Sequence, residues 1–273
     1  MSELSEEQPG ILEAVGADGV CRITIDRPNV GNSLSPLARD ALIDAFQRAG
    51  ENPAVRAVLL GATGQRHFCA GAGLPGSAPR PPAGDKRSGD VARMLQNGWQ
   101  RLVSSILDCD KPVVAAVKGT AAGAGISLVL ACDLVVMSTE AKLVAAFVHR
   151  GVLPDSGAIH LLTRIVGLRK ATELLMLGEP VDAASSERLG LVNRVVGPDA
   201  TDEVAGELAA RLAAGPTVML GHTKRLLLVS SESGRDRAFE QEAWAQEAVS
   251  RTTDLQEGLR SFAERREPRF LGR

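Results

Sequence analysis

The sequence predicts an α/β core over residues 1–200 and a helical C-terminal region over residues 201–273. Segments with strand-like and helix-like patterns alternate through the first two thirds, and helical patterns dominate the last third. A chain of 273 residues suits one large domain with an appendage. Its 44% hydrophobic and 23% charged residues are ordinary for a globular protein.

The predicted elements follow in a regular order. Two short strands span residues 12–26, and Ser35 is placed to cap a helix over 36–49 that has Pro36 at its first position. A strand over 113–117 runs into a Gly/Ala-rich turn, and a helix is expected from Ile126. Other strands are expected at 55–61, 134–137, 143–147 and 189–196, and other helices at 91–107, 157–166, 170–177 and within 201–264.

The tetrapeptide Ala-Gly-Ala-Gly occurs twice, at 70–73 and at 122–125. Each copy follows an apolar strand and precedes a helical segment, which indicates a repeated strand–turn–helix unit. A dinucleotide-binding turn would need glycine at position 128, which is Leu, and the Gly-Lys-Ser/Thr of a phosphate-binding loop is missing. Two facing turns would instead offer two backbone amides to one oxygen, as an oxyanion hole does. Close packing of helix on strand explains the glycines equally well.

Composition disfavours several classes of function. The net charge is −2 and no helix is rich in Lys or Arg, so we expect no nucleic-acid partner. The four cysteines and four histidines are dispersed, so we expect no metal site and a reducing, cytosolic location. The apolar segments are too short to span a bilayer, and the acidic start of the chain is not a secretory signal.

Several motifs resemble the crotonase, or enoyl-CoA hydratase/isomerase, superfamily. They run in order through the chain as FCAGAGL (68–74), KPVVAAVKGTAAGAGISLVLACDLVV (111–136), VLPDSGAIHLLTRIVG (152–167) and LGLVNRVV (189–196). The resemblance implies a spiral of repeated ββα units, a helical trimerisation region, and trimers or dimers of trimers. It also implies an acyl-CoA thioester as substrate and no separate cofactor, because coenzyme A is part of the substrate.

The resemblance assigns site residues one by one. The two amides that hold the thioester oxygen fall on Ala72 and Ala124. Gly73 stands where the family usually has Asp, and Pro75 where some relatives have a lysine near the CoA phosphates. The positions that correspond to contacts with coenzyme A are Asn29, Val30, Ser33, Ala70, Gly73, Leu74, Lys224 and Phe262.

The acid/base positions depart from the hydratase pattern. Hydratases of the family use two glutamates, and the corresponding residues here are Ser127 and Phe147. Neither residue takes a proton from water at neutral pH. General acid–base catalysis contributes roughly 10²–10⁴-fold, so the two-glutamate hydration mechanism is not expected to work efficiently.

Asp155 is the remaining candidate base. It matches a position where some relatives place a catalytic Asp, including isomerases that shift a double bond between C3 and C2. The structural alternative is a helix N-cap, because Asp155 precedes a predicted helix. If residues 147–149 are extended, His149 faces the same side as Phe147 and joins the substrate pocket with Ser127.

The sequence therefore predicts an acyl-CoA-processing enzyme, with an isomerase-type double-bond shift through Asp155 as the leading hypothesis. Two alternatives stay open. The first is an enoyl-CoA hydratase of low or altered activity. The second is an acyl-CoA-binding homologue without catalysis.

Overall fold

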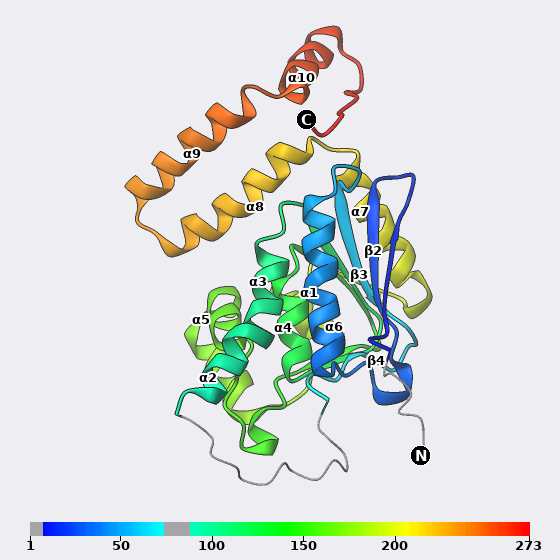
Figure 1. The fold of residues 1–273 in the computed structure, drawn as a ribbon, viewed down its shortest axis with the longest axis vertical. Helices are drawn as coiled ribbons and strands as arrows, with labels where there is room; N and C mark the ends of the chain where they lie inside the picture. Colours follow the sequence, from blue (N-terminus) through cyan, green and yellow to red (C-terminus); the bar gives the residue numbers. More distant parts are fainter. Residues whose placement is uncertain (1–7, 74–87) are drawn as a thin grey trace.

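The structure, a computed structural model, describes residues 8–73 and 88–273, and it confirms an α/β core with a helical C-terminal region (Figure 1). Two sheets form the core. The six-stranded sheet has the order β1 (Ile11–Val15), β2 (Val20–Ile25), β3 (Ala57–Ala62), β5 (Val113–Val117), β7 (Leu134–Ser138) and β10 (Arg194–Val196). The four-stranded sheet has the order β4 (His67–Cys69), β6 (Thr120–Ala122), β8 (Lys142–Val144) and β9 (Val181–Asp182).

A strand pair repeats three times along the chain and builds both sheets. In β3–β4, β5–β6 and β7–β8, the first strand enters the large sheet and the second enters the small one. Neighbouring repeats pair in parallel within each sheet. The pairs are followed by the helices α2 (Asp90–Leu95) and α3 (Arg101–Leu107), α4 (Ala124–Ala131), and α5 (Ala158–Leu177). This arrangement confirms the repeated ββα unit.

Several predicted boundaries are confirmed and others are wrong. Helix α1 (Pro36–Glu51) begins where expected, and the Ser35 hydroxyl accepts a hydrogen bond of 3.3 Å from the amide of Ala38. Helix α4 begins at Ala124 rather than Ile126, so the second glycine turn itself starts the helix. Strand β8 ends at Val144, not at 147, because the chain turns there into the short 3-10 helix η3 (Val148–Arg150).

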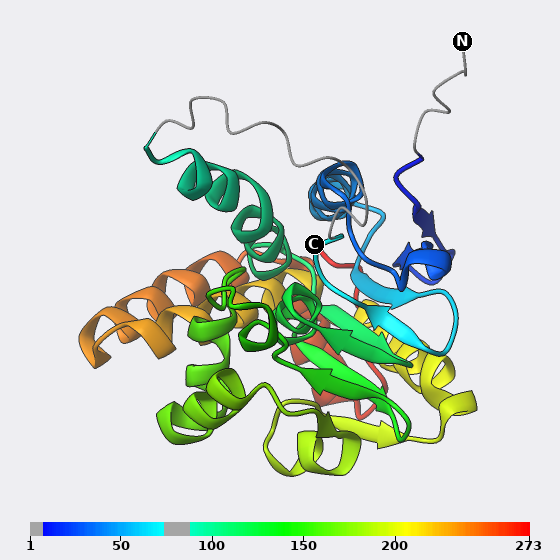
Figure 2. The same ribbon diagram turned by 90° about the horizontal axis from the view of Figure 1, so that it is seen from below.

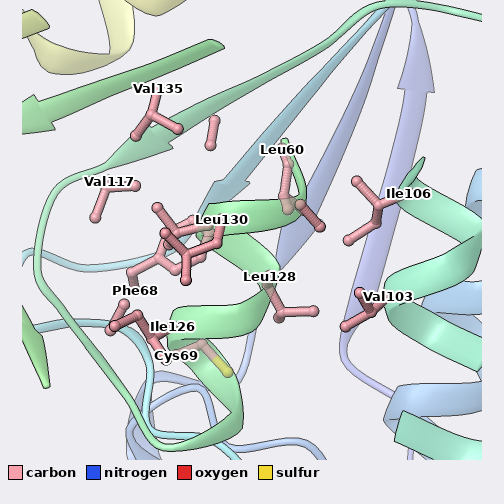
Figure 3. Close-up of a cluster of buried hydrophobic side chains, with 14 of the residues drawn as sticks. Leu60, Phe68, Cys69, Val103, Ile106, Val117, Ile126, Leu128, Leu130 and Val135 are labelled. Carbon is pink, nitrogen blue, oxygen red and sulfur yellow. The ribbon is translucent and has the colours of Figure 1, made fainter. Parts of the chain in front are cut away.

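Helix α4 lies at the centre of the main hydrophobic core. All eight of its residues are buried, so apolar side chains surround the helix on every side. Figure 3 shows Ile126, Leu128 and Leu130 of α4 among side chains from the sheets and α3. A helix enclosed in this way cannot shift without disturbing its neighbours, and its first residues are therefore held firmly in place.

A single helix packs against the opposite face of the large sheet. Helix α7 (Thr201–Ala213) places Ala205, Ala209 and Ala213, spaced by four residues, against valines and alanines of the strands. The small side chains let the helix approach the sheet closely. The first helix of the C-terminal region is thus part of the packing of the core.

The remaining helices extend away from the core (Figures 1 and 2). They are α8 (Thr217–Glu232), α9 (Arg235–Val249) and α10 (Thr253–Glu264). Over residues 8–73 and 88–273, no helix combines the length and apolarity that crossing a membrane requires. The exposed apolar side chains on these helices include Leu227, Trp244 and Phe262.

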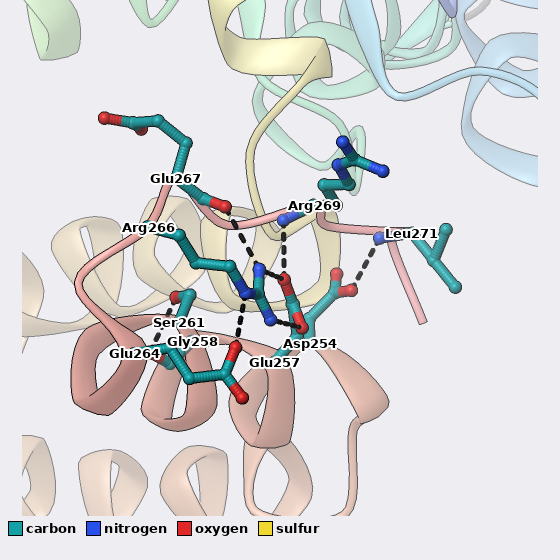
Figure 4. Close-up of polar contacts among 9 residues, drawn as sticks. All are labelled: Asp254, Glu257, Gly258, Ser261, Glu264, Arg266, Glu267, Arg269 and Leu271. Carbon is teal, nitrogen blue, oxygen red and sulfur yellow. Dashed lines mark hydrogen bonds and ion pairs between the residues drawn. The ribbon is translucent and has the colours of Figure 1, made fainter.

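The C-terminal tail is fastened to α10 by charged groups (Figure 4). Arg266 binds both carboxylate oxygens of Glu257 at 2.6 and 2.9 Å, and it lowers the pKa of Glu257 to about 2. Asp254 accepts hydrogen bonds from the amides of Leu271 and Gly272 at 2.6 and 2.7 Å. Arg56 of the core then donates to the carbonyl of Phe270 at 3.0 Å, so the tail is also tied to the sheet.

An ion pair made by a buried lysine anchors α8 to the core. The Lys224 ammonium lies 2.9 Å from the Asp133 carboxylate and donates to the carbonyl of Ile106 at 2.8 Å. Only 7% of the Lys224 side chain is exposed. Asp133 also accepts from the amide of Val113 at 2.7 Å, so the pair joins α8, the end of α3 and the start of β5.

The two Ala-Gly-Ala-Gly turns touch each other. Strand β4 pairs with β6, with Cys69 opposite Ala121. A Cβ atom on Gly71 would lie 3.0 Å from the amide nitrogen of Ala124, and one on Gly125 would lie 2.2 Å from the carbonyl oxygen of Cys69. The glycines are therefore required because backbone lies against backbone at this point.

We predict that Gly125→Ala destabilises the protein, because the added methyl overlaps a backbone carbonyl that cannot move aside. Overpacking of this kind costs about 1–3 kcal/mol or more in the free energy of unfolding. The control is Gly206→Ala in α7, where no atom lies within 4 Å of the added methyl. That change should raise stability by about 0.5–1 kcal/mol. Chemical denaturation measures both variants, and equal stabilities would contradict the account.

We also predict that Lys224→Ala lowers the free energy of unfolding by about 1.5–3 kcal/mol, because it removes a buried ammonium together with its contacts to Asp133 and to the carbonyl of Ile106. The neighbouring Arg225 supplies a control, since its ion pair with Asp110 is 66% exposed on both sides. Arg225→Ala should cost less than about 1 kcal/mol. Urea titration of the two variants makes the comparison, and a small effect of Lys224→Ala would refute the anchoring role.

Candidate active site

Among the described residues, the first glycine turn contains one backbone amide without an acceptor. Ala72 forms a β-bridge with Leu34, whose amide donates to Gly71 at 2.9 Å and whose carbonyl accepts from Gly73 at 3.0 Å. This pattern uses the carbonyl of Gly71 and the amide of Gly73, and the Gly71 amide donates to the sulfur of Cys69 at 3.4 Å. Within residues 8–73 and 88–273, the Ala72 amide has no acceptor, and the residue is exposed.

The second glycine turn leaves a matching amide. Ala124 is the first residue of α4, and its N-cap Gly123 supplies no side-chain cap. The amide of Gly123 donates to Val144 and that of Ile126 donates to Gly123, whereas the Ala124 amide has no acceptor in the described part of the chain. First-turn amides of a helix lack internal partners and carry the positive end of the helix dipole.

The two amides belong to turns in backbone contact, because Gly71, next to Ala72, lies directly against the nitrogen of Ala124. Two preorganised amide donors near each other can hold one oxygen on which negative charge develops. The structure thus brings together the pair of turns that the sequence left as separate motifs. The sequence left two explanations for the glycines, close packing of the backbone and exposure of backbone amides. The structure shows that one explanation does not exclude the other, because the turns pack closely through the same glycines that flank Ala72 and Ala124.

The loop predicted to contact coenzyme A lies beside the first turn. The Ala70 amide donates to Gly31 at 3.0 Å, and a Cβ on Gly73 would lie 3.6 Å from the Ser33 hydroxyl. Asn29 and Val30 are exposed on the 3-10 helix η1 (Pro28–Val30). Gly31 and Ser33 therefore lie beside the first turn, and the contacts of this loop with coenzyme A stay predictions. Leu74 and Pro75 lie outside the described residues.

Asn32 organises this loop, and sequence reasoning missed it. Its side-chain amide donates to the carbonyls of Thr63 and His67 at 2.9 and 2.7 Å, and its oxygen accepts from the amide of Arg27 at 2.9 Å. The residue is 1% exposed and has a φ of +54°. The available signal was an Asn directly after Gly31, since Asn is one of the few side chains that tolerate the left-handed region.

Asp155 is half-buried in the turn before α5, and its carboxylate does not cap the helix. The N-cap of α5 is Gly157, without a side-chain cap, and the amide of Ala158 donates to the backbone carbonyl of Asp155 at 3.0 Å. Burial raises the pKa of Asp155, and hydrogen bonding to Ser156 opposes that rise. The capping alternative is thus not supported.

Ser127 contacts the turn that carries Asp155. Its hydroxyl lies 3.0 Å from that of Ser156, and both residues are fully buried. Sequence reasoning did not single out Ser156. Its only signal was its place next to Asp155, because a Ser in a Gly-rich turn is ordinary. The contact links α4, which begins at Ala124, to the residue after the candidate base.

Phe147 and His149 lie differently from the expectation. Phe147 has helical backbone angles (φ −60°, ψ −46°) and is buried. The segment is therefore not extended, and the prediction that His149 faces the same side as Phe147 loses its basis. The His149 imidazole instead lies 3.0 Å from the carbonyl of Gly178, at the surface.

The two C-terminal candidates have contrasting environments. Lys224 is occupied by the anchoring ion pair, so the structure favours a packing role for it. Phe262 on α10 is 86% exposed and contacts no core cluster of the described residues. Their contacts with coenzyme A stay predictions.

Comparison with known proteins shows the family of the chain. The family model described as enoyl-CoA hydratase/isomerase matches residues 16–273. The chain is 34% identical over 259 residues to a "probable enoyl-CoA hydratase" of Rhodobacter capsulatus, covering 94% of this chain and 96% of the relative. It is 32% identical over 255 residues to the "1,2-epoxyphenylacetyl-CoA isomerase" of Escherichia coli, covering 93% and 96%.

Solved structures agree with the sequence relatives. The crystal structure of a "putative enoyl-CoA hydratase" from Streptomyces coelicolor A3(2) superposes with a TM-score of 0.89 and 32% identity, and it covers 100% of both chains. The match includes both sheets and the helical C-terminal region. From its two touching amide turns, its repeated ββα units and these relatives, the chain belongs to the enoyl-CoA hydratase/isomerase family, the crotonase superfamily.

Proposed function

We propose that the protein is an isomerase that shifts the double bond of a 3-enoyl-CoA to the 2-position. The observation that carries this proposal is the contact between the turns of Ala72 and Ala124, together with the 3.0 Å contact that joins Ser127 of α4 to Ser156, the residue after Asp155. The amides of Ala72 and Ala124, which have no acceptor among the described residues, would form the oxyanion hole, and Asp155 is a carboxyl whose pKa is raised by burial. The family includes hydratases and isomerases, and the resemblance places Ser127 and Phe147 where hydratases have glutamates.

The proposed reaction moves one proton and no other atom. The ionised carboxylate of Asp155 removes a proton from C2, and the electron pair of that bond moves toward the thioester oxygen. The Ala72 and Ala124 amides donate to the resulting enolate oxygen. The carboxylic acid of Asp155 then returns the proton to C4, which leaves the double bond between C2 and C3. Coenzyme A stays attached throughout, so the reaction needs no separate cofactor.

The raised pKa of Asp155 suits both halves of this reaction. A general base works best when its pKa lies near the operating pH, because it must accept a proton and then give it up. An ordinary Asp, with a pKa near 3.9, is a weak base. Burial without a counter-charge raises the pKa and thereby strengthens the base.

Two other readings make different predictions. A hydratase of low or altered activity would add water to a 2-enoyl-CoA. A non-catalytic homologue would bind acyl-CoA and leave every acyl chain unchanged. We favour isomerisation over both because the carboxylate of Asp155 is not used as a helix cap.

We further propose assembly as a trimer or a dimer of trimers in the cytosol. The exposed Leu227, Trp244 and Phe262 on the protruding helices support assembly, because contact between subunits would remove such large apolar side chains from water. Light scattering on the purified protein measures the assembly directly.

Asp155→Asn should lower 3-enoyl-CoA isomerisation by about 10²–10⁴-fold, because the amide keeps the shape and cannot take the proton. The matched control is Asp236→Asn, whose side chain is exposed on α9 and should leave the rate unchanged. Full turnover by Asp155→Asn would rule out Asp155 as the base. Hydration of a 2-enoyl-CoA and binding of an acyl-CoA, measured in parallel, separate the other two readings.

The rate of isomerisation should also fall on the acidic side. The base works in its ionised form, so activity is lost as the pH drops through the pKa of Asp155. Burial raises that pKa, so the loss should be centred above the ordinary Asp value near 3.9. The pH profile of kcat/KM on a 3-enoyl-CoA measures the position of this limb. A limb at or below the ordinary value would disagree with a buried base.

A further inference from the structure

The direction of the Ala72 amide is set by a hydrogen bond on the other side of its peptide unit. A trans peptide bond is planar, so its C=O and its N–H point in opposite directions. The N–H of Ala72 shares a trans peptide unit with the carbonyl of Gly71, and that carbonyl accepts from the amide of Leu34 at 2.9 Å. The Ala72 N–H therefore points away from Leu34 as long as this hydrogen bond is kept.

The Ala124 amide takes its direction from its own helix. It shares a peptide unit with the carbonyl of Gly123, which accepts from the amide of Ile126 at 3.1 Å. Ile126 lies in the first turn of α4, which is buried on all sides, so this donor is oriented by its own element. The Ala72 donor, by contrast, is oriented by Leu34, which belongs to a different segment of the chain.

Leu34 also fixes the rotation of the peptide unit that carries the Ala72 N–H. Its carbonyl accepts from the amide of Gly73 at 3.0 Å, so the residues before and after Ala72 are both bonded to Leu34. These two bonds make the β-bridge between Leu34 and Ala72. The Leu34 side chain is 2% exposed and packs in the main core, which keeps the backbone of Leu34 in place.

Asn32 determines where the loop that ends in Leu34 lies. Its side-chain amide donates to the carbonyls of Thr63 and His67 at 2.9 and 2.7 Å. Thr63 directly follows β3, and His67 begins β4, the strand that leads into the first glycine turn. One buried side chain therefore fastens the loop to the same stretch of chain that carries Ala72.

The backbone conformation of Asn32 shows why the side chain is needed. Its φ of +54° lies in the left-handed region, which glycine adopts freely and which Asn tolerates better than most residues. Glycine would therefore satisfy the backbone at this position. What glycine lacks is the side-chain amide, with its two donors and one acceptor. The same property makes Asn32→Gly a clean test of that amide.

We propose that Asn32 and Leu34 are positioning residues for the Ala72 amide. Asn32 holds the loop in place, and Leu34 sets the direction of the amide through the carbonyl of Gly71. The hydrogen bond from Leu34 also polarises this peptide unit, which makes the Ala72 N–H a stronger donor. The proposal rests on the oxyanion hole of the proposed function and adds to it the two residues that orient one of its donors.

The first variant removes a single hydrogen-bond donor. Replacement of Leu34 by its α-hydroxy acid analogue, introduced by nonsense suppression, puts an oxygen in place of the N–H and leaves every side chain unchanged. The hydrogen bond to Gly71 is then lost. The matched control is the same replacement at Val58, at the start of β3, whose amide donates to the carbonyl of Pro112 at 2.9 Å. Each protein loses one backbone hydrogen bond, but only the first loses it at the donor peptide.

The second variant is Asn32→Gly, which is expected to fold because glycine suits the backbone at this position. Its control is Asn193→Ala. The Asn193 side-chain oxygen accepts from the amide of Val135 at 2.7 Å, in the large sheet and outside both glycine turns. Thermal melts measure the stability of all four proteins, so that a loss of catalysis can be compared with a loss of stability.

The first readout separates kcat from KM on a 3-enoyl-CoA. Loss of one oxyanion donor costs about 10²–10³-fold in kcat, so a misdirected donor should lower kcat by about 10-fold or more. We expect this fall in Asn32→Gly and in the Leu34 analogue, and an unchanged kcat in both controls. A rise of KM with kcat unchanged would overturn the proposal, because the loop would then serve binding alone. Lower stability with unchanged kcat and KM would overturn it as well.

The second readout needs no turnover. The probe is butyryl-CoA with ¹³C at the thioester carbonyl, a saturated ligand whose carbonyl stretch is followed by infrared difference spectroscopy. Two amide donors polarise the carbonyl and should lower its stretching frequency on binding. The shift should be smaller in Asn32→Gly and in the Leu34 analogue and complete in both controls. A complete shift in the Leu34 analogue would overturn the positioning role.

The two readouts also distinguish the failure of this proposal from that of the proposed function. If the unaltered protein binds butyryl-CoA without a shift, the oxyanion hole fails and the positioning role fails with it. If the shift is present but Asp155→Asn keeps full activity, only the isomerase mechanism through Asp155 fails. The infrared comparison of the Leu34 and Val58 analogues then still decides whether Leu34 orients the Ala72 amide.

Discussion

The contact between the two glycine turns is the constraint on which the site depends. Parallel pairing of β4 with β6 brings backbone against backbone, and a side chain on Gly71 or Gly125 would collide with it. Among the residues that the structure describes, the amides of Gly73 and Gly123 have acceptors, whereas those of Ala72 and Ala124 have none. The donors of the candidate oxyanion hole are therefore backbone groups whose positions are set by the fold, and they do not depend on the alanine side chains.

The rest of the fold holds this contact in place. Helix α4 is buried on all sides, so the Ala124 amide at its start cannot drift. Asn32 fastens the loop that pairs with the first turn, through three hydrogen bonds made by one buried side chain. An electrostatic site gains from such rigidity, because donors that are already oriented cost no reorganisation when charge develops.

The sequence was enough to predict the motifs, but it was not enough to predict how the motifs lie relative to one another in space. The repeated Ala-Gly-Ala-Gly turns, the Ser35 cap and the alternation of strands and helices are local signals, and the structure confirms them. The meeting of the turns, the burial of Lys224 and the Ser127–Ser156 contact depend on residues far apart in the chain. The end of β8 was misplaced because the apolar run through Phe147 fits a strand and a buried 3-10 turn equally well.

The central claim is that one ligand oxygen lies between the Ala72 and Ala124 amides while Asp155 faces the reacting carbons. A crystal structure of the Asp155→Asn protein with a bound 3-enoyl-CoA tests it most directly. The account predicts the thioester oxygen at about 2.7–3.1 Å from both amide nitrogens, with the side chain at position 155 in contact with C2 and C4. A thioester oxygen away from these amides, or a side chain at position 155 remote from both carbons, would contradict it.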